Sequence, residues 1–151
     1  TGGRLKRIYS YIKNEKAVCF TYGDGLIDLN IEDLIKFHKK HKKLATLTAV
    51  KPPARYGAIK IQKSIVTEFV EKPYGEGGMI NGGYFVISPK VVNYIQDDNT
   101  SWETTPLEEL INDNQLMAYE HQGFFHPMDT VRDKNYLEEL WSTRNAPWKK
   151  W

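Results

Sequence analysis

The 151-residue sequence predicts an α/β fold with a mixed, mostly parallel central sheet flanked by helices, and three observations support this prediction. Two short apolar runs, AVCFTY (17–22) and LATLTAV (44–50), have the composition of strands buried on both faces of a parallel sheet. A helical pattern separates them, which predicts a right-handed strand–helix–strand unit. Further runs at 82–88 and 116–128 indicate that the sheet continues.

The first helix of this unit has a clear start and end. Asn30 can cap its first turn, Glu32 and Asp33 lie where the helix dipole favours acids, and four lysines crowd its C-terminal end. The apolar face is predicted to consist of Ile31, Leu34, Ile35 and His38.

The middle of the chain predicts a loop and a hairpin. Prolines favour a loop over 51–57, and the segments 58–61 and 65–72 then alternate with period two around Gln62–Ser64, which is typical of a hairpin with one solvated face. Beyond the strand at 82–88, Ser88 and Pro89 are expected to open a short helix through Ile95.

Two more helices are expected in the C-terminal part. Thr105 and Pro106 open a helix whose apolar residues are Leu107, Leu110 and Ile111. Thr130 and Asp133 resemble a capping box at the start of the last helix. The apolar residues of that last helix are Tyr136, Leu137, Leu140 and Trp141.

Composition excludes several classes of protein. A net charge of +2 is too balanced to indicate a nucleic-acid partner, and no apolar stretch approaches the length of a membrane span. Cys19 is the single cysteine, so there is no disulfide framework and a reducing, cytoplasmic location is expected. The length fits one domain over residues 1–151.

Two acids lie where strands are predicted to end. Asp24, in YGDGL, follows the first strand, at the edge where open α/β sheets bind ligands, although Gly-Asp-Gly is equally typical of a turn. Asp129, in HPMDT, lies between a strand segment and a helix, where a capping role is the commoner one. Mg²⁺ prefers one or two carboxylates together with substrate phosphates, so the two acids together favour a phosphate-handling site.

The stretch EKPYGEGGMINGGYF (71–85) is the second candidate. Lys72 can supply a point charge to a phosphate and Glu71 can accept hydrogen bonds from hydroxyls, although a solvated surface pair is the ordinary interpretation. Asn81 offers a donor and an acceptor, or else belongs to a turn. The glycines either form a loose loop or allow the backbone to pass close to a ligand. The four histidines have no metal-ligand spacing, and no nucleophile pattern is present.

Several motifs, in order along the whole chain, resemble the sugar-1-phosphate nucleotidylyltransferases. They are TGGRLKR, TYGDGL, KPPARYGAI, VEKP, GGMINGGYFV, PLEEL, PMDTVRDKNYLEELW and APWKKW. GD and EKP occur across the superfamily, whereas PPARYGAI, INGGYFV and the APWK ending resemble its cytidylyl branch.

This resemblance implies a Rossmann-like nucleotidyltransferase fold and a reaction in which CTP and glucose 1-phosphate give CDP-glucose and pyrophosphate. It implies that Asp24 and Asp129 hold Mg²⁺, that Lys72 neutralises the sugar phosphate and that Glu71 binds sugar hydroxyls. It also implies a homo-oligomer, with Trp148 and Trp151 in a tail that makes a subunit contact or folds onto its own domain. The remaining substrate-binding residues that it implies are Arg4, Gly23, Tyr56, Gly57, Asn81 and Gly82.

The sequence departs from the family at its start. The family's G-x-G-T-R loop and Pro-Lys-Pro segment, which hold the triphosphate, are absent, so we expect a single partial domain corresponding to the C-terminal portion of such an enzyme. The strand at 17–22 should then expose an apolar edge, and the isolated chain is expected to fold poorly and to be inactive. The alternatives are a non-catalytic sugar-phosphate-binding domain, or a transferase that uses dTTP or UTP.

Overall fold

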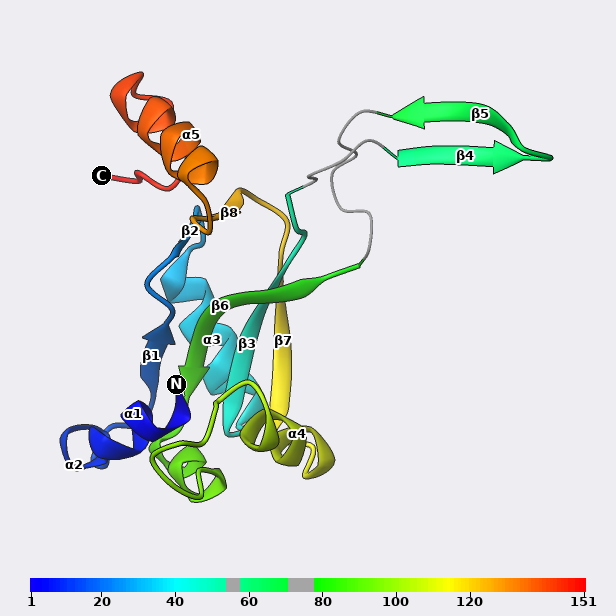
Figure 1. Ribbon diagram of the computed structural model, residues 1–151. Helices are drawn as coiled ribbons and strands as arrows, with labels where there is room; N and C mark the ends of the chain where they lie inside the picture. Colours follow the sequence, from blue (N-terminus) through cyan, green and yellow to red (C-terminus); the bar gives the residue numbers. More distant parts are fainter. Residues whose placement is uncertain (54–57, 71–77) are drawn as a thin grey trace. The chain divides into compact units, whose positions relative to one another are not determined.

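The computed structural model describes residues 1–53, 58–70 and 78–151 (Figure 1). Its helices and strands are α1 (Gly2–Arg7), α2 (Tyr9–Ile12), β1 (Val18–Thr21), β2 (Gly25–Ile27), α3 (Ile31–His41), β3 (Ala45–Val50), β4 (Ala58–Gln62), β5 (Ile65–Val70), β6 (Ile80–Ile87), the 3₁₀ helix η1 (Pro89–Tyr94), α4 (Thr105–Asn112), β7 (Leu116–His121), β8 (Phe125–Pro127) and α5 (Val131–Ser142).

The chain divides into two compact units. The first unit consists of 1–22, 30–48 and 83–119, and the second of 23–29, 49–82 and 120–151. Each unit is therefore built from three separate stretches of chain. The interpretation as a single domain stays a prediction.

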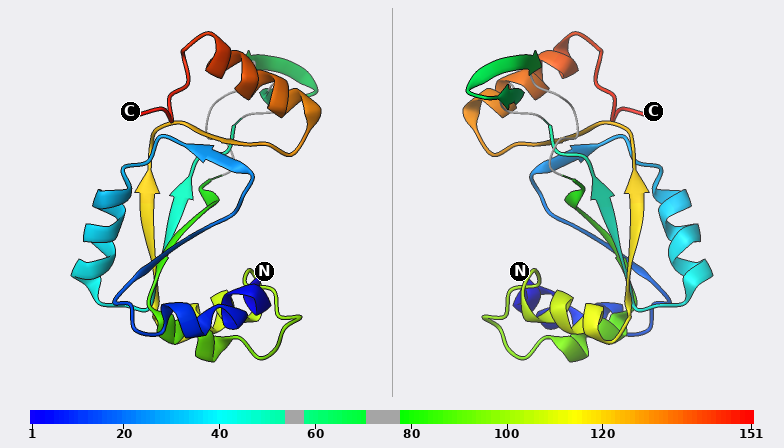
Figure 2. Two further views of the ribbon diagram at one scale, coloured as in Figure 1. Left: turned by 90° about the vertical axis from the view of Figure 1, so that its left-hand side faces the viewer. Right: turned by 90° about the vertical axis from the view of Figure 1, so that its right-hand side faces the viewer.

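A four-stranded sheet in the order β1-β6-β3-β7 confirms the mixed α/β prediction. β1 pairs antiparallel with β6, with Val18 opposite Ile87 and Thr21 opposite Tyr84. β3 and β7 run in the same direction, and α3 lies along one face of the sheet (Figure 2). Helices α1 and α4 lie on the other side, near the end at which β3 and β7 begin.

The prediction that residues 17–22 form a strand buried on both faces of a parallel sheet is wrong. β1 is antiparallel to its neighbour, lies at the end of the strand order and alternates in burial, with Cys19 and Thr21 exposed. Because the exposed Cys19 is itself apolar, the half-exposed strand reads in the sequence as an unbroken apolar run. β1 lies at the edge of this sheet, as expected, and β6 lies between β1 and β3.

The core of the first unit packs helices against the sheet. Trp102 is fully buried and makes edge-to-face contacts with Phe20 at 6.0 Å and Phe85 at 5.8 Å between ring centroids. Such pairs contribute roughly 0.5–1.5 kcal/mol each beyond burial. The buried members of this core are Leu5, Ala45, Phe85, Ile87, Val91, Ile95, Trp102 and Leu110.

The helix starts that were predicted from a capping side chain are confirmed. Asn30 accepts hydrogen bonds from the backbone N–H groups of Glu32 and Asp33, at 3.0 and 3.3 Å. Thr130 and Asp133 form a complete capping box at α5. Ser88 caps the short helix as expected, but the helix is 3₁₀.

Three assignments of helix faces need correction. In α3, Leu34 and His38 are buried, but Ile31, in the first turn, is 51% exposed. In α4, Leu110 is fully buried, but Ile111 is 61% exposed because the short helix turns that position to solvent. In α5, Leu137 is buried, whereas Tyr136 and Trp141 are both exposed.

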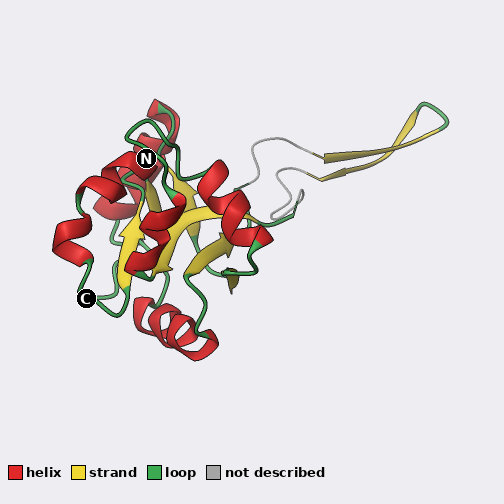
Figure 3. Cartoon of the chain, turned by 90° about the horizontal axis from the view of Figure 1, so that it is seen from below, coloured by secondary structure: helices red, strands yellow, loops and turns green. Residues whose placement is uncertain are grey.

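The second unit contains two small antiparallel ladders, β2 with β8 and β4 with β5. The β4–β5 hairpin was predicted (Figure 3), and its turn places Lys63 and Ser64 in the left-handed region at φ 47° and 66°. The prediction of one solvated face is wrong for its described side chains, since Ile65 and Val66, on opposite faces, are both exposed. Strand β2 was not predicted.

None of the helices in the described part of the chain is long and apolar enough to cross a membrane.

Candidate functional site

The β2–β8 ladder places Asp24. Gly25 pairs with Pro127 and Leu26 with His126, and the backbone N–H of Met128 donates to the carbonyl oxygen of Asp24 at 2.7 Å. Asp24 therefore lies at the end of this ladder beside the Met128 backbone, and its residue is exposed to solvent.

Asp129 lies at the same end of the ladder. It follows Met128 directly and precedes Thr130, the N-cap of α5. Its residue is also exposed. Two carboxyl-bearing residues 105 positions apart in sequence are thus brought to neighbouring backbone positions, both in the second unit.

The chemistry of this pair suits a hard divalent cation. Two exposed acidic residues can offer oxygen ligands, and no cluster of three or more histidine, cysteine or acidic side chains forms a metal cage among the described residues. A site with two protein carboxylates leaves coordination positions for water and for phosphate oxygens, which is the arrangement Mg²⁺ prefers. The residues present therefore fit a magnesium ion shared with a phosphate ligand.

Three other predicted residues belong to the second unit. Gly23 precedes Asp24 in sequence and is exposed, and a Cβ added there would meet nothing within 4 Å. Asn81 is exposed and Gly82 is buried, at the start of β6. The open space at Gly23 is compatible with a ligand near its backbone.

The other predicted residues are placed differently. Arg4 lies in α1, exposed, in the first unit. Tyr56, Gly57, Glu71 and Lys72 lie outside the described residues.

The structure shows why two positions must be glycine, which the sequence alone did not show. Gly83 has a left-handed backbone, φ 75°, and a Cβ there would lie 2.6 Å from the ring of Tyr22. In TGGR, a Cβ on Gly3 would lie 2.0 Å from the carbonyl oxygen of Asp98. Both glycines are required by packing within the first unit, and Gly78, at φ 87°, faces open space.

Glu103 holds a hydrogen-bonded cluster that sequence reasoning missed. Its carboxylate accepts from the hydroxyls of Thr1 and Ser101, both at 2.6 Å, and the Thr1 hydroxyl also accepts from the backbone N–H of Trp102. These hydroxyls, together with that of Tyr22, outweigh desolvation and lower the pKa of Glu103 to about 2. The carboxylate therefore stays charged and fixes Tyr22, the residue that precedes Gly23.

Two histidine–carboxylate pairs lie in the second unit. His121 Nε2 is 2.8 Å from Asp28 Oδ1, and Lys150 Nζ is 3.6 Å from the other oxygen of the same carboxylate. His126 Nε2 is 3.2 Å from Asp133 Oδ1. Each of these histidines contacts an acid on another segment, and the spacing of the histidines in the sequence does not reveal these contacts.

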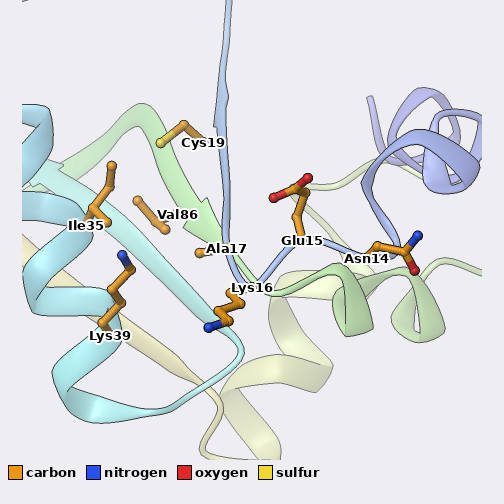
Figure 4. A pocket seen from close by; sticks show the side chains of 8 residues that line it. All are labelled: Asn14, Glu15, Lys16, Ala17, Cys19, Ile35, Lys39 and Val86. Carbon is orange, nitrogen blue, oxygen red and sulfur yellow. The ribbon is translucent and has the colours of Figure 1, made fainter.

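A separate hollow of about 400 Å³ lies in the first unit (Figure 4). It contains none of the predicted site residues. Partial desolvation raises the pKa of the Cys19 thiol, so this thiol is not an activated nucleophile. Its lining consists of Asn14, Glu15, Lys16, Ala17, Cys19, Ile35, Lys39 and Val86.

Comparison with known proteins identifies the family. Residues 4–143 match the model of the nucleotidyl transferase family. The chain belongs to this family. It is 56% identical over all 151 residues to the glucose-1-phosphate cytidylyltransferase of Salmonella typhi. It is 36% identical over 152 aligned residues to the probable glucose-1-phosphate cytidylyltransferase of Bacillus subtilis. The chain spans 59% of the length of each of these relatives.

Two solved structures share the fold. HddC from Yersinia pseudotuberculosis matches with a TM-score of 0.66 at 22% identity, over 93% of this chain and 62% of that one. A putative glucose-1-phosphate thymidylyltransferase from Bacillus anthracis matches with a TM-score of 0.65 at 17% identity, over all of this chain and 61% of its own. The predicted nucleotidyltransferase architecture is thereby confirmed.

Proposed function

We propose that the chain supplies the metal- and sugar-phosphate-binding part of a glucose-1-phosphate cytidylyltransferase. In the reaction, a phosphate oxygen of glucose 1-phosphate attacks the α-phosphorus of CTP, the bond to the β-phosphate breaks and pyrophosphate leaves. The observation that carries the proposal is the 56% identity over the whole chain to relatives of that name. The pairing of the Asp24 and Asp129 segments supports it.

Asp24 and Asp129 would hold the magnesium ion, which supplies positive charge to the phosphates when it is bound. The ladder between β2 and β8 fixes the backbones that carry the two acids before substrate arrives, so little ordering is left for the reaction. Neither side chain is buried, and neither is needed by the core.

Five further roles follow from the family resemblance. Lys72 would neutralise the phosphate of the sugar and Glu71 would accept hydrogen bonds from sugar hydroxyls. Asn81, with the backbone of Gly82 and of Tyr56–Gly57, would line the sugar pocket. Gly23 would leave room beside the metal, and Arg4 would lie near the nucleotide.

The proposal is tested by pyrophosphate release from the full-length gene product with CTP, Mg²⁺ and glucose 1-phosphate. Asp24→Asn and Asp129→Asn should each lower kcat/KM by roughly 10²–10³ while melting temperatures stay unchanged. Glu138→Gln, an exposed acid on α5, is the matched control and should retain full turnover. Full Mg²⁺-dependent turnover in either aspartate variant would overturn its metal role.

The base specificity is tested in the same assay with dTTP, UTP and GTP in place of CTP. Mannose-1-phosphate guanyltransferases are 30–35% identical to parts of this chain, below the 56% of the two Salmonella cytidylyltransferases, which favours CTP. Binding of glucose 1-phosphate without pyrophosphate release from any triphosphate would favour the non-catalytic sugar-phosphate-binding alternative.

We also propose that the protein acts in the cytoplasm as a homo-oligomer. The single cysteine supports a reducing compartment, and the family resemblance supports assembly. Light scattering of the full-length product measures the oligomer directly, and a monomer at all concentrations would contradict this part of the proposal.

A further inference from the structure

The carboxylate of Asp133 joins two segments on either side of Asp129. Its Oδ2 accepts hydrogen bonds from the backbone N–H and the hydroxyl of Thr130, at 3.0 and 2.8 Å. Its Oδ1 lies 3.2 Å from Nε2 of His126. One side chain thus binds the residue three positions before Asp129 and the residue directly after it.

His126 is itself held firmly on β8. Its backbone pairs with Leu26 of β2, the strand that follows Asp24. Its ring packs against Tyr136, at 4.8 Å between centroids, and stacks with Phe124 at 6.4 Å. The side chains of His126 and Asp133 are each only 16% exposed, so water competes weakly for their contact.

Ordinary helix capping does not require this link. A capping box needs only Thr130 and Asp133, and theirs is complete without His126. The additional contact connects the start of α5 to the strand that pairs beside Asp24. It closes a short loop in which Met128 donates to the Asp24 carbonyl and Asp129 is the next residue.

We propose that Asp133, with His126, is a positioning residue that fixes the Asp129 turn opposite Asp24 and so sets the affinity of the site for its divalent cation. This inference rests on the metal role proposed above for Asp24 and Asp129. Loss of a residue that orients a metal ligand typically weakens metal affinity by about 10–100-fold. Hydrogen bonds from Thr130 and His126 also lower the pKa of Asp133, so it stays an acceptor at neutral pH.

The decisive variant is His126→Phe. It keeps a ring between Phe124 and Tyr136 and leaves the capping box intact, but it removes the link from the strand to Asp133. Asp133→Ala removes both ends of the link. Both variants should weaken Mn²⁺ binding by about 10-fold, measured on the full-length gene product from the free-ion electron paramagnetic resonance signal. In turnover, the half-saturating Mg²⁺ concentration should rise while KM for glucose 1-phosphate changes little.

Asn30→Ala is the matched control, because it removes the cap of another helix, α3, at a comparable cost in stability. It should leave Mn²⁺ binding unchanged, which separates positioning from general destabilisation. Normal Mn²⁺ affinity in His126→Phe would overturn the positioning role if Asp129→Asn had lost binding. If Asp129→Asn bound Mn²⁺ as tightly as the unaltered protein, that result would instead overturn the proposed metal site itself.

Discussion

The buried hydroxyl of Thr46 offers a test of the polar contacts beneath α3. Its Oγ1 lies 2.7 Å from Nε2 of His41 and 2.9 Å from Nδ1 of His38. The backbone N–H of Lys43 donates to Nδ1 of His41 at 2.9 Å, so the proton of that ring is on Nε2. His41 therefore donates to Thr46, and the Thr46 hydroxyl donates to His38. The single Thr46 hydroxyl thus provides a hydrogen-bond partner for one nitrogen of each ring.

Thr46→Val keeps the shape of the side chain and removes both bonds. Thr46 is fully buried and His38 is 5% exposed, so water cannot readily replace the lost partner. Two net hydrogen bonds at about 1 kcal/mol each, with the added cost of an unsatisfied buried ring nitrogen, predict a loss of roughly 2–4 kcal/mol. Urea unfolding of the full-length gene product at pH 7.5 measures this loss. Hydrogen exchange of the α3 amides reports it locally.

Thr48 supplies the matched control two residues along the same strand. It too is fully buried, but its hydroxyl has no hydrogen-bond partner in the described part of the chain. Thr48→Val should therefore be neutral or stabilising, by up to about 1 kcal/mol, and Thr46→Ser should retain most of the stability. Equal stability of the Thr46→Val and Thr48→Val proteins would refute the assignment of these hydrogen bonds.

The remaining predictions concern pH and glycine. Burial, together with the neighbouring His41, lowers the pKa of His38 to about 4, so the unfolded chain binds the proton more readily. The stability that this contributes should be present above pH 6.5 and fall by roughly 2 kcal/mol as the pH drops to 5, a slope that His38→Gln should reduce in pH-dependent melts. Gly3→Ala forces a Cβ against the Asp98 carbonyl and should cost about 1–3 kcal/mol in unfolding free energy. Gly23→Ala meets open space and should leave the melt unchanged, and a fall in turnover there would support its proposed substrate contact. Gly123→Ala places a Cβ against Asp28 Oδ1 and the ring of His121, so a crystal structure of the variant should show the 2.8 Å contact between these two side chains lost, and a retained contact would contradict this packing.

Features that depend on neighbours in sequence were predictable. Asn30 and the Thr130–Asp133 capping box act within four residues of themselves, and both are present as expected. The hairpin around Gln62–Ser64 is equally local. The strands β3, β6 and β7 could be found from their apolar composition alone.

Features that depend on distant partners were not predictable. An apolar run such as 17–22 has one pattern whether its outward side meets another layer or water, so the edge position of β1 could not be read from it. Gly3 and Gly83 are required by Asp98 and Tyr22, which lie far away along the chain. The three-residue strand β2 is too short to produce a pattern of its own.

That missed strand is the element on which the candidate site depends. Asp24 was as consistent with a turn as with a ligand, a capping role was the commoner interpretation of Asp129, and nothing in the sequence between them links one to the other. The pairing of Gly25 with Pro127, and the Met128 N–H that donates to the Asp24 carbonyl, turn two ambiguous acids into neighbours. If the ladder is what makes the site, Met128→Pro, which removes that N–H, should weaken Mn²⁺ binding as severely as the loss of one carboxylate, and Met128→Leu should not. Equal Mn²⁺ binding by these two variants would mean that the carboxylates find each other without the ladder.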